Sequence, residues 1–320
     1  MPRYIRNTVI LAKLETSYGT DAAPTGADAL LVSNVSVTRS ANNVNRDLIR
    51  GYMGASEQLV GTRSIECEFT VELAGSGTAG TAPAWGKLLR GCGCAEVIVG
   101  SPTPTHVEYT PVSAGFESLT IYYYLDGLVH KALGCRGTVD IRVPLGERPV
   151  MQFRFTGIDG GAAAQANPTP TLAAWKTPIV VTDPNTGDIT LDGAYSAGAI
   201  SGGTVYPSRG LEVTLGQSVQ YIPLLGGDQV DITGRETTGR MTLDLTAAQE
   251  AAMIADIAAN TLTSVGITHG TAAGNTIVLF APAVQRINPR VEDVEGRALV
   301  SMDLRLTPSS GNDEIRVVAK

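Results

Sequence analysis

The residues best placed to do chemistry form a glycine-rich string, Gly75-Ser76-Gly77-Thr78-Ala79-Gly80, which fits the pattern G-x-G-x-x-G. In a dinucleotide-binding site such a string follows a strand and opens a helix, and an acidic residue about twenty positions later binds the ribose. Glu96 stands near that later position. This string would give the chain the chemistry of a nucleotide-dependent enzyme.

The strand before the string argues against that enzyme. Residues 64–73 alternate strictly between apolar side chains and polar ones, three of them glutamates. The first strand of a dinucleotide-binding fold is buried on both faces and is continuously apolar. No rhythm of alternating strands and helices follows. We therefore expect a glycine loop, no catalytic residues and no cofactor.

The cysteines and histidines do not form a metal-binding pattern. Cys92 and Cys94 have the spacing C-x-C, Cys135 lies far away, and the three histidines are scattered. Structural zinc sites use paired C-x₂₋₄-C or histidine pairs. We expect small buried or semi-exposed thiols, no metal site and no nucleophilic triad.

Length and charge exclude further classes. The 320 residues favour about two domains. The net charge is −7, and residues 161–320 hold 10 basic against 16 acidic side chains. An acidic surface is poorly suited to bind phosphate backbones, although it can lie near nucleic acid without binding it. The short apolar run at residues 9–12 is too weak for a signal peptide and too short to span a membrane. Four cysteines in 320 residues do not make a disulfide scaffold, so we expect a cytoplasmic, reduced protein.

Strand patterns dominate the chain. The clearest hairpin joins residues 119–125 to residues 128–133 through Asp126-Gly127, a pair that favours a tight primed turn. Two helices are expected, at residues 83–90 and 247–259, the second with Thr246 and Gln249 at capping-box positions. Further strands are expected at residues 30–38, 137–143, 150–156, 178–181, 189–191, 211–215, 239–245, 265–269, 276–280, 298–306 and 314–318.

Parts of the chain repeat. Residues 69–73 resemble residues 241–245, and residues 151–156 resemble residues 302–307, with Arg154 and Arg305 in the same slot. We predict two tandem antiparallel β-sandwich or β-barrel modules, each with a short flanking helix. The first spans residues 1–157 with an N-terminal arm and an insertion near 101–115. A Gly/Pro/Ala-rich connection with short strands covers 158–207, and the second module covers 208–320.

Two long loops at matching places mix apolar and charged residues, which is typical of contact surfaces. They cover residues 45–62 and 221–238. The candidates for subunit or ring contacts are Arg46, Asp47, Arg50, Tyr52, Met53, Glu57, Leu224, Asp228, Asp231 and Arg235. The alternative is a loop folded back on its own module.

Four stretches resemble the major tail tube proteins of long-tailed, siphovirus-like bacteriophages. They are D-L-I-R-G-Y-M-G-A-S-E-Q-L-V-G-T-R, V-E-L-A-G-S-G-T-A-G-T-A-P-A-W-G-K-L-L-R, F-E-S-L-T-I-Y-Y-Y-L-D-G and L-R-L-T-P-S-S-G-N-D-E. The resemblance implies a β-sandwich or barrel flanked by a helix, which assembles in the host cytoplasm into stacked rings around a DNA channel in the virion tail. The long loops would make the contacts between subunits and between rings.

The resemblance also implies partners. These are further copies of the chain, the tape measure protein and viral DNA in the lumen, and terminator and tail-tip proteins at the ends. Three two-module chains would replace the usual six single modules, although a hexamer stays open. Glu68, Glu72 and Asp244 are the candidates to line the lumen. The alternatives are a terminator, a capping ring or a secretion-tube component of the same fold.

Overall fold

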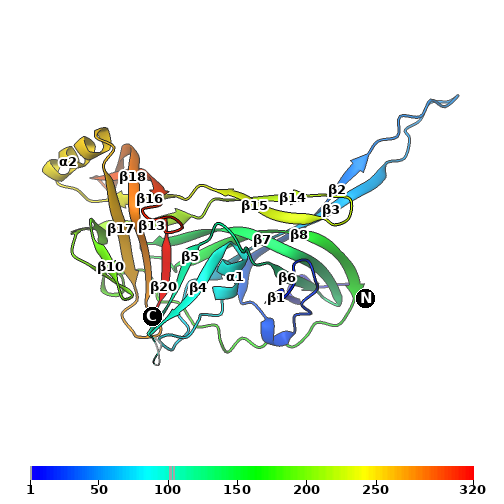
Figure 1. Ribbon diagram of the computed structural model, residues 1–320, viewed down its shortest axis with the longest axis horizontal. Helices are drawn as coiled ribbons and strands as arrows, with labels where there is room; N and C mark the ends of the chain where they lie inside the picture. Colours follow the sequence, from blue (N-terminus) through cyan, green and yellow to red (C-terminus); the bar gives the residue numbers. More distant parts are fainter. Residues whose placement is uncertain (1, 101–102, 104) are drawn as a thin grey trace.

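The computed structural model describes residues 2–100, 103 and 105–320. Residues 101, 102 and 104, which belong to the expected insertion, lie outside the described residues. The chain is mainly β, as predicted, and most of its strands belong to one large antiparallel sheet (Figure 1).

The described residues of the first half form eight strands, one short α-helix and one 3₁₀ turn. These are β1 Thr8–Leu14, η1 Gly26–Asp28, β2 Val32–Val44, β3 Leu59–Glu72, α1 Gly86–Gly91, β4 Cys94–Val99, β5 His106–Pro111, β6 Leu119–Leu125, β7 Leu128–Pro144 and β8 Val150–Ala164.

Short elements and then eight longer strands follow. The short elements are η2 Asp183–Asn185, β9 Ile189–Leu191, β10 Ala194–Ser196, β11 Ala199–Ser201 and β12 Thr204–Tyr206. The eight strands are β13 Ser208–Thr214, β14 Gln217–Ile222, β15 Gln229–Arg235, β16 Thr238–Leu243, β17 Leu262–His269, β18 Ile277–Val294, β19 Arg297–Thr307 and β20 Arg316–Ala319, and the helix α2 Ala247–Ala258 lies between β16 and β17.

The same order of four strands occurs twice in the sheet. In the first half it is β2-β3-β8-β7, and in the second half it is β13-β16-β19-β18. In the first half, the second strand of the β2–β3 hairpin pairs with β8 of the β7–β8 hairpin. In the second half, the second strand of the β13–β16 pair pairs in the same way with β19 of the β18–β19 hairpin. This repeated order is what a duplicated module would produce.

The two halves are joined edge to edge at two places. Strand β13 pairs with β7, with Val213 opposite Ile141, so the two four-strand blocks form one continuous surface. Strand β20 lies between β18 and β5, so the C-terminal strand completes a sheet of the first half. Backbone groups at these strand edges are therefore satisfied within the chain.

The first hairpin of each four-strand block extends beyond its own block (Figure 1). In the second half, β13 and β16 form its base, and β14 and β15 continue it after a break at Gly216. In the first half, β2 and β3 remain paired, with two register shifts, up to a tip at residues 45–58. We call residues 39–64 the projecting hairpin, and residues 217–235 the docked hairpin.

The core side of the sheet follows the alternation in β3. Phe69 is fully buried and stacks near Phe153 and Phe155 of β8, with ring centroids 6.0 and 5.9 Å away. Trp85, Leu88 and Leu89 of the α1 segment are buried in the same core. The period of two expected for residues 64–73 is thus confirmed.

Several local predictions are confirmed and others need correction. The turn at Asp126-Gly127 has positive φ at both residues, and Thr246 and Gln249 form the capping box of α2. However, α1 begins at Gly86 rather than at residue 83, because Pro83 to Gly86 forms a single turn. Residues 178–181 are not a strand, since among them only Val181 bonds to the β7–β8 turn.

The match between Arg154 and Arg305 is out of register by two residues. Phe69 lies opposite Phe153, whereas Met241, its counterpart in the repeated string, lies opposite Met302. Phe153 therefore corresponds to Met302, and Arg154 corresponds to Asp303. A shift of two keeps a side chain on the same face of a strand, which is why similar strings arise without equivalent positions.

Candidate assembly surfaces

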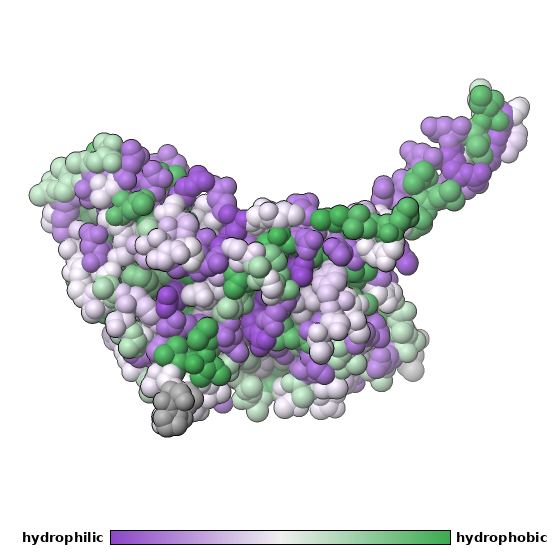
Figure 2. Space-filling view, viewed as in Figure 1, coloured by the Kyte–Doolittle hydropathy of each residue, from purple (hydrophilic) through white to green (hydrophobic). Residues whose placement is uncertain are grey.

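The projecting hairpin ends in a tip that touches no other part of the described chain in Figure 1. Ile49 and Met53 are fully exposed there, and Tyr52 is 70% exposed. Figure 2 shows hydrophobic side chains at the end of this arm. Exposed apolar residues that cluster on a protruding element are typical of an interaction surface.

Ion pairs within the tip connect its two sides. Glu57 accepts a hydrogen bond from Nη2 of Arg50 at 2.9 Å and also pairs with Arg46, which holds the two sides of the loop together. Asp47 is exposed. These ion pairs hold together a loop that presents apolar side chains, which is the arrangement expected of a contact loop.

The docked hairpin lies across the first half of the chain instead (Figure 1). Val230 is fully buried, its N–H donates to the hydroxyl oxygen of Tyr18 at 2.5 Å, and its carbonyl accepts from Nη1 of Arg136 at 2.8 Å. Asp231 pairs with the same guanidinium. The hairpin is thereby anchored on β7.

The remaining candidates of the second loop divide between anchoring and exposure. Arg235 donates to the carbonyl of Val112 at 2.9 Å and pairs with Glu314 at 2.7 Å, so it holds the base of the docked hairpin. Asp228 accepts from the hydroxyl of Tyr221 at 2.7 Å, and Leu224 is exposed at the tip. The two loops that the sequence matches thus have different environments, one docked within the chain and one projecting.

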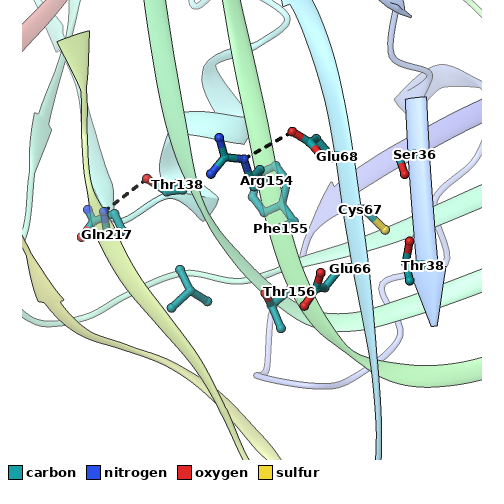
Figure 3. Close-up of a pocket in the computed structure, with 11 residues that line it drawn as sticks. Ser36, Thr38, Glu66, Cys67, Glu68, Thr138, Arg154, Phe155, Thr156 and Gln217 are labelled. Atoms are coloured by element: carbon teal, nitrogen blue, oxygen red, sulfur yellow. Dashed lines mark hydrogen bonds and ion pairs between the residues drawn. The ribbon is translucent and has the colours of Figure 1, made fainter. Parts of the chain in front are cut away.

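The three acidic candidates for the lumen lie along the sheet, each beside an arginine. Glu68 is 3.3 Å from Nε of Arg154, Glu72 is 2.7 Å from Arg148, and Asp244 pairs with Arg297. Glu68 and Arg154 line a groove of about 260 Å³ on the polar side of β3 and β8, beside the docked hairpin (Figure 3). The acidic charge is therefore locally balanced.

The groove has a mixed lining. It consists of hydroxyls, one guanidinium, two carboxylates, an amide, the thiol of Cys67 and the apolar side chains of Phe155 and Val219. Burial raises the pKa of that thiol to about 12, so it is protonated near neutral pH and is a poor nucleophile. The backbone N–H of Gln217, in the docked hairpin, donates a hydrogen bond to the hydroxyl of Thr138 at 3.2 Å (Figure 3). This bond is a structural contact.

The glycine-rich string joins the two halves rather than forming a phosphate cradle. Gly75 donates its N–H to the side-chain oxygen of Asn275 at 2.8 Å, and Gly77 donates to the carbonyl of Gly274 at 2.8 Å. A phosphate cradle needs such N–H groups free. A Cβ on Gly75 would stand 2.1 Å from the carbonyl oxygen of Gly274, so glycine is needed for close approach of two backbones.

The described residues contain no cluster of three or more His, Cys, Asp or Glu side chains able to hold a metal ion. All four cysteines are free and buried, as expected. Burial raises the pKa of Cys92 and Cys135 well above the usual range and that of Cys94 to about 12. Over the same residues, none of the helices has the length and apolar character needed to cross a bilayer.

Two features of this surface escaped sequence reasoning. The first is the socket of Tyr18 and Arg136 that holds the docked hairpin. The second is the last part of β18, where Val291 is 63% exposed although it sits opposite the buried Val300. The socket joins residues about a hundred or more positions apart, and an open strand edge depends on the pairing of its neighbours, so no local pattern marks either one.

The described residues form a strand-rich chain with two blocks of the same strand order, open strand edges and an exposed apolar hairpin tip, features that are typical of structural proteins. A family model described as phage tail tube protein matches residues 5–314. The chain therefore belongs to the phage tail tube protein family and has a structural role in the virion tail. Among curated proteins, none matches the chain.

Proposed function

We propose that three copies of this chain close into a ring with six similar blocks, and that such rings stack to form the tail tube. The observation that supports this proposal is the pairing of β7 with β13, which joins two blocks of the same strand order inside one chain. A head-to-tail contact of the same kind, repeated between chains, closes into a ring.

The projecting hairpin supplies contacts between chains and between rings. Arg46, Asp47, Arg50, Tyr52, Met53 and Glu57 are its proposed contact residues. In the second loop, Leu224 and Asp228 lie at the tip, while Asp231 and Arg235 act indirectly by holding the docked hairpin in place. The tape measure protein and viral DNA would occupy the lumen, and terminator and tail-tip proteins the ends of a tube assembled in the host cytoplasm.

The polar side of the sheet, which includes Glu68, Glu72 and Asp244, is proposed to face the DNA. A conduit must not retain its cargo, and carboxylates repel phosphates. The arginine beside each carboxylate limits the repulsion, so the surface is weakly rather than strongly repulsive. Replacing all three acids with lysine should make tubes retain DNA; unchanged DNA ejection in such a variant would contradict this assignment.

Electron microscopy of the purified protein tests the proposal. Tubes with a central channel and three chains per repeat are the expected result. A ring of six chains, each contributing one block to the wall, would overturn the trimer. Single rings that never stack would identify a terminator or capping component instead, and a protein that stays monomeric at high concentration, alone and with its tail partners, would contradict the tube.

A further inference from the structure

The open end of β18 matches the part of β7 that receives β13. Strand β7 pairs with β8 on one side and with β13 on the other over Asp140 to Pro144. Residues 290–294 of β18 pair with β19 on one side, and among the described residues no strand pairs with their other side. Both strands stand at the same place in the repeated order, so β18 lacks the neighbour that β7 has.

The register of the two closing hairpins shows which residues correspond. Met151 lies two positions before Phe153, and Val300 lies two positions before Met302, so Met151 and Val300 correspond. Ile141 is paired with Met151, and Val291 is paired with Val300. Val291 is therefore the counterpart of Ile141. Ile141 is fully buried under β13, whereas Val291 is 63% exposed.

Strand β2 is the counterpart of β13 and also has an open edge. Each strand contains one bulge with positive φ, at Asn34 in β2 and at Gly210 in β13. Counting from these bulges, Val37 corresponds to Val213, the residue that lies opposite Ile141. Strand β2 pairs only with β3 among the described residues, so its other edge is free.

We propose that β2 of one chain pairs antiparallel with residues 290–294 of β18 in a second copy, with Val37 opposite Val291. This seam copies the contact of β13 with β7 and rests on the proposed ring. On the polar side it places Ser36 opposite Glu292 and Thr38 opposite Arg290. It buries Val291 on the core side and satisfies two rows of unpaired backbone groups.

The same correspondence gives the projecting hairpin its place. In the chain, the docked hairpin continues from the β13 base and lies across β7 and β8 of the neighbouring block (Figure 1). Residues 39–64 continue from the β2 base in the same way. They therefore lie across β18 and β19 of the second copy, which covers the exposed apolar side chains Val44, Leu59 and Val60.

Paired cysteines test the register. A chain with Val37→Cys and Val291→Cys should, on mild oxidation of assembled tubes, give disulfide-linked dimers and trimers on a nonreducing gel. The four native cysteines are buried and should not contribute. An equal mixture of the two single variants should give dimers and nothing larger, because each chain then carries one new thiol.

Control variants separate failure of this seam from failure of the tube. Leu31→Cys with Val291→Cys is the out-of-register control and should not cross-link. Tubes that form but cross-link through Leu31, or not at all, would overturn the seam while leaving the proposed function intact. A protein that forms neither rings nor tubes would overturn both.

A charge at the seam gives an independent readout. Val291→Asp should abolish ring formation while the melting temperature of the monomer stays within a few degrees, because this side chain is exposed before assembly. Val205→Asp, at an exposed valine in β12, is the matched control and should assemble. Normal tubes from Val291→Asp would contradict the seam.

Discussion

Gly75 and Asn275 are linked by a hydrogen bond of 2.8 Å from the backbone N–H of the first to the side-chain oxygen of the second. The bond connects the loop after β3 with the loop before β18, and so connects the two halves of the chain. A string that resembles a nucleotide-binding motif serves here to let two backbones approach each other. Stability of the two halves should therefore depend on the absence of a side chain at this position.

Gly75→Ala should destabilise the protein by about 1–3 kcal/mol, the usual cost of forcing an extra group into a packed site. The added Cβ would stand 2.1 Å from the backbone oxygen of Gly274, which cannot move aside as a flexible side chain could. Urea unfolding measures the effect. Gly227→Ala is the control, since a Cβ there would meet nothing within 4 Å, and equal stability of the two variants would contradict the prediction.

Arg136→Ala should release the docked hairpin. The guanidinium bonds to the carbonyls of Val230 and Phe116 and pairs with Asp231, and its side chain is only 11% exposed. Removing it takes a charged donor from each of these oxygens, of which the Val230 carbonyl keeps only the Tyr18 hydroxyl at 3.5 Å, at a cost of about 1–3 kcal/mol. Hydrogen exchange over residues 217–235 should become faster.

The control for the docked hairpin is Arg305→Ala, which removes an exposed ion pair with Glu236. Such pairs contribute about 0–1 kcal/mol, so exchange over the same residues should be nearly unchanged. If the Arg136 variant keeps full protection over residues 217–235, the hairpin does not depend on this socket.

Met53→Asp should block assembly without affecting the fold. The side chain is fully exposed at the tip of the projecting hairpin, so its replacement should change the free energy of unfolding of the isolated chain little. A charge in an apolar contact would disfavour association. Light scattering and electron microscopy follow tube formation, with Leu262→Asp as an exposed control on β17. Tubes of normal length from the Met53 variant would exclude the tip as a contact.

Stability should fall as the pH drops from about 7 to 5, and part of this dependence should come from His269. Burial lowers the pKa of this imidazole below its usual value. Below the unfolded pKa of about 6.5, His269 binds a proton more readily in the unfolded chain than in the folded chain, so the folded state loses stability there. Above that pH both states are neutral and the contribution vanishes.

His269→Gln should flatten the pH dependence, because the titrating group is gone. Urea unfolding at several pH values gives the slope. His130 also has a pKa lowered by burial, so some slope should remain. A slope equal to that of the unchanged chain would show that His269 is not the group that titrates.

Periodic segments were predictable because their patterns are local. The alternation in β3, the Asp126-Gly127 turn and the capping box of α2 each involve residues within a few positions of one another. The repeated strings correctly indicated two similar strand blocks. They misaligned Arg154 with Arg305 because strings of alternating residues match equally well when shifted by two. The boundaries at residues 157 and 207 stay a prediction, and β8 itself continues to Ala164.

By itself, the sequence determined the mainly β character, the tail tube resemblance and the candidate loops, since each depends on the order of neighbouring residues. The tertiary structure alone decided that β13 closes onto β7, that β20 completes a sheet of the first half, and that one hairpin docks while the other projects. These outcomes depend on which strand edges meet. Every strand edge carries the same backbone donors and acceptors, so pairing between edges is chosen by packing over long distances and leaves little mark in the local sequence.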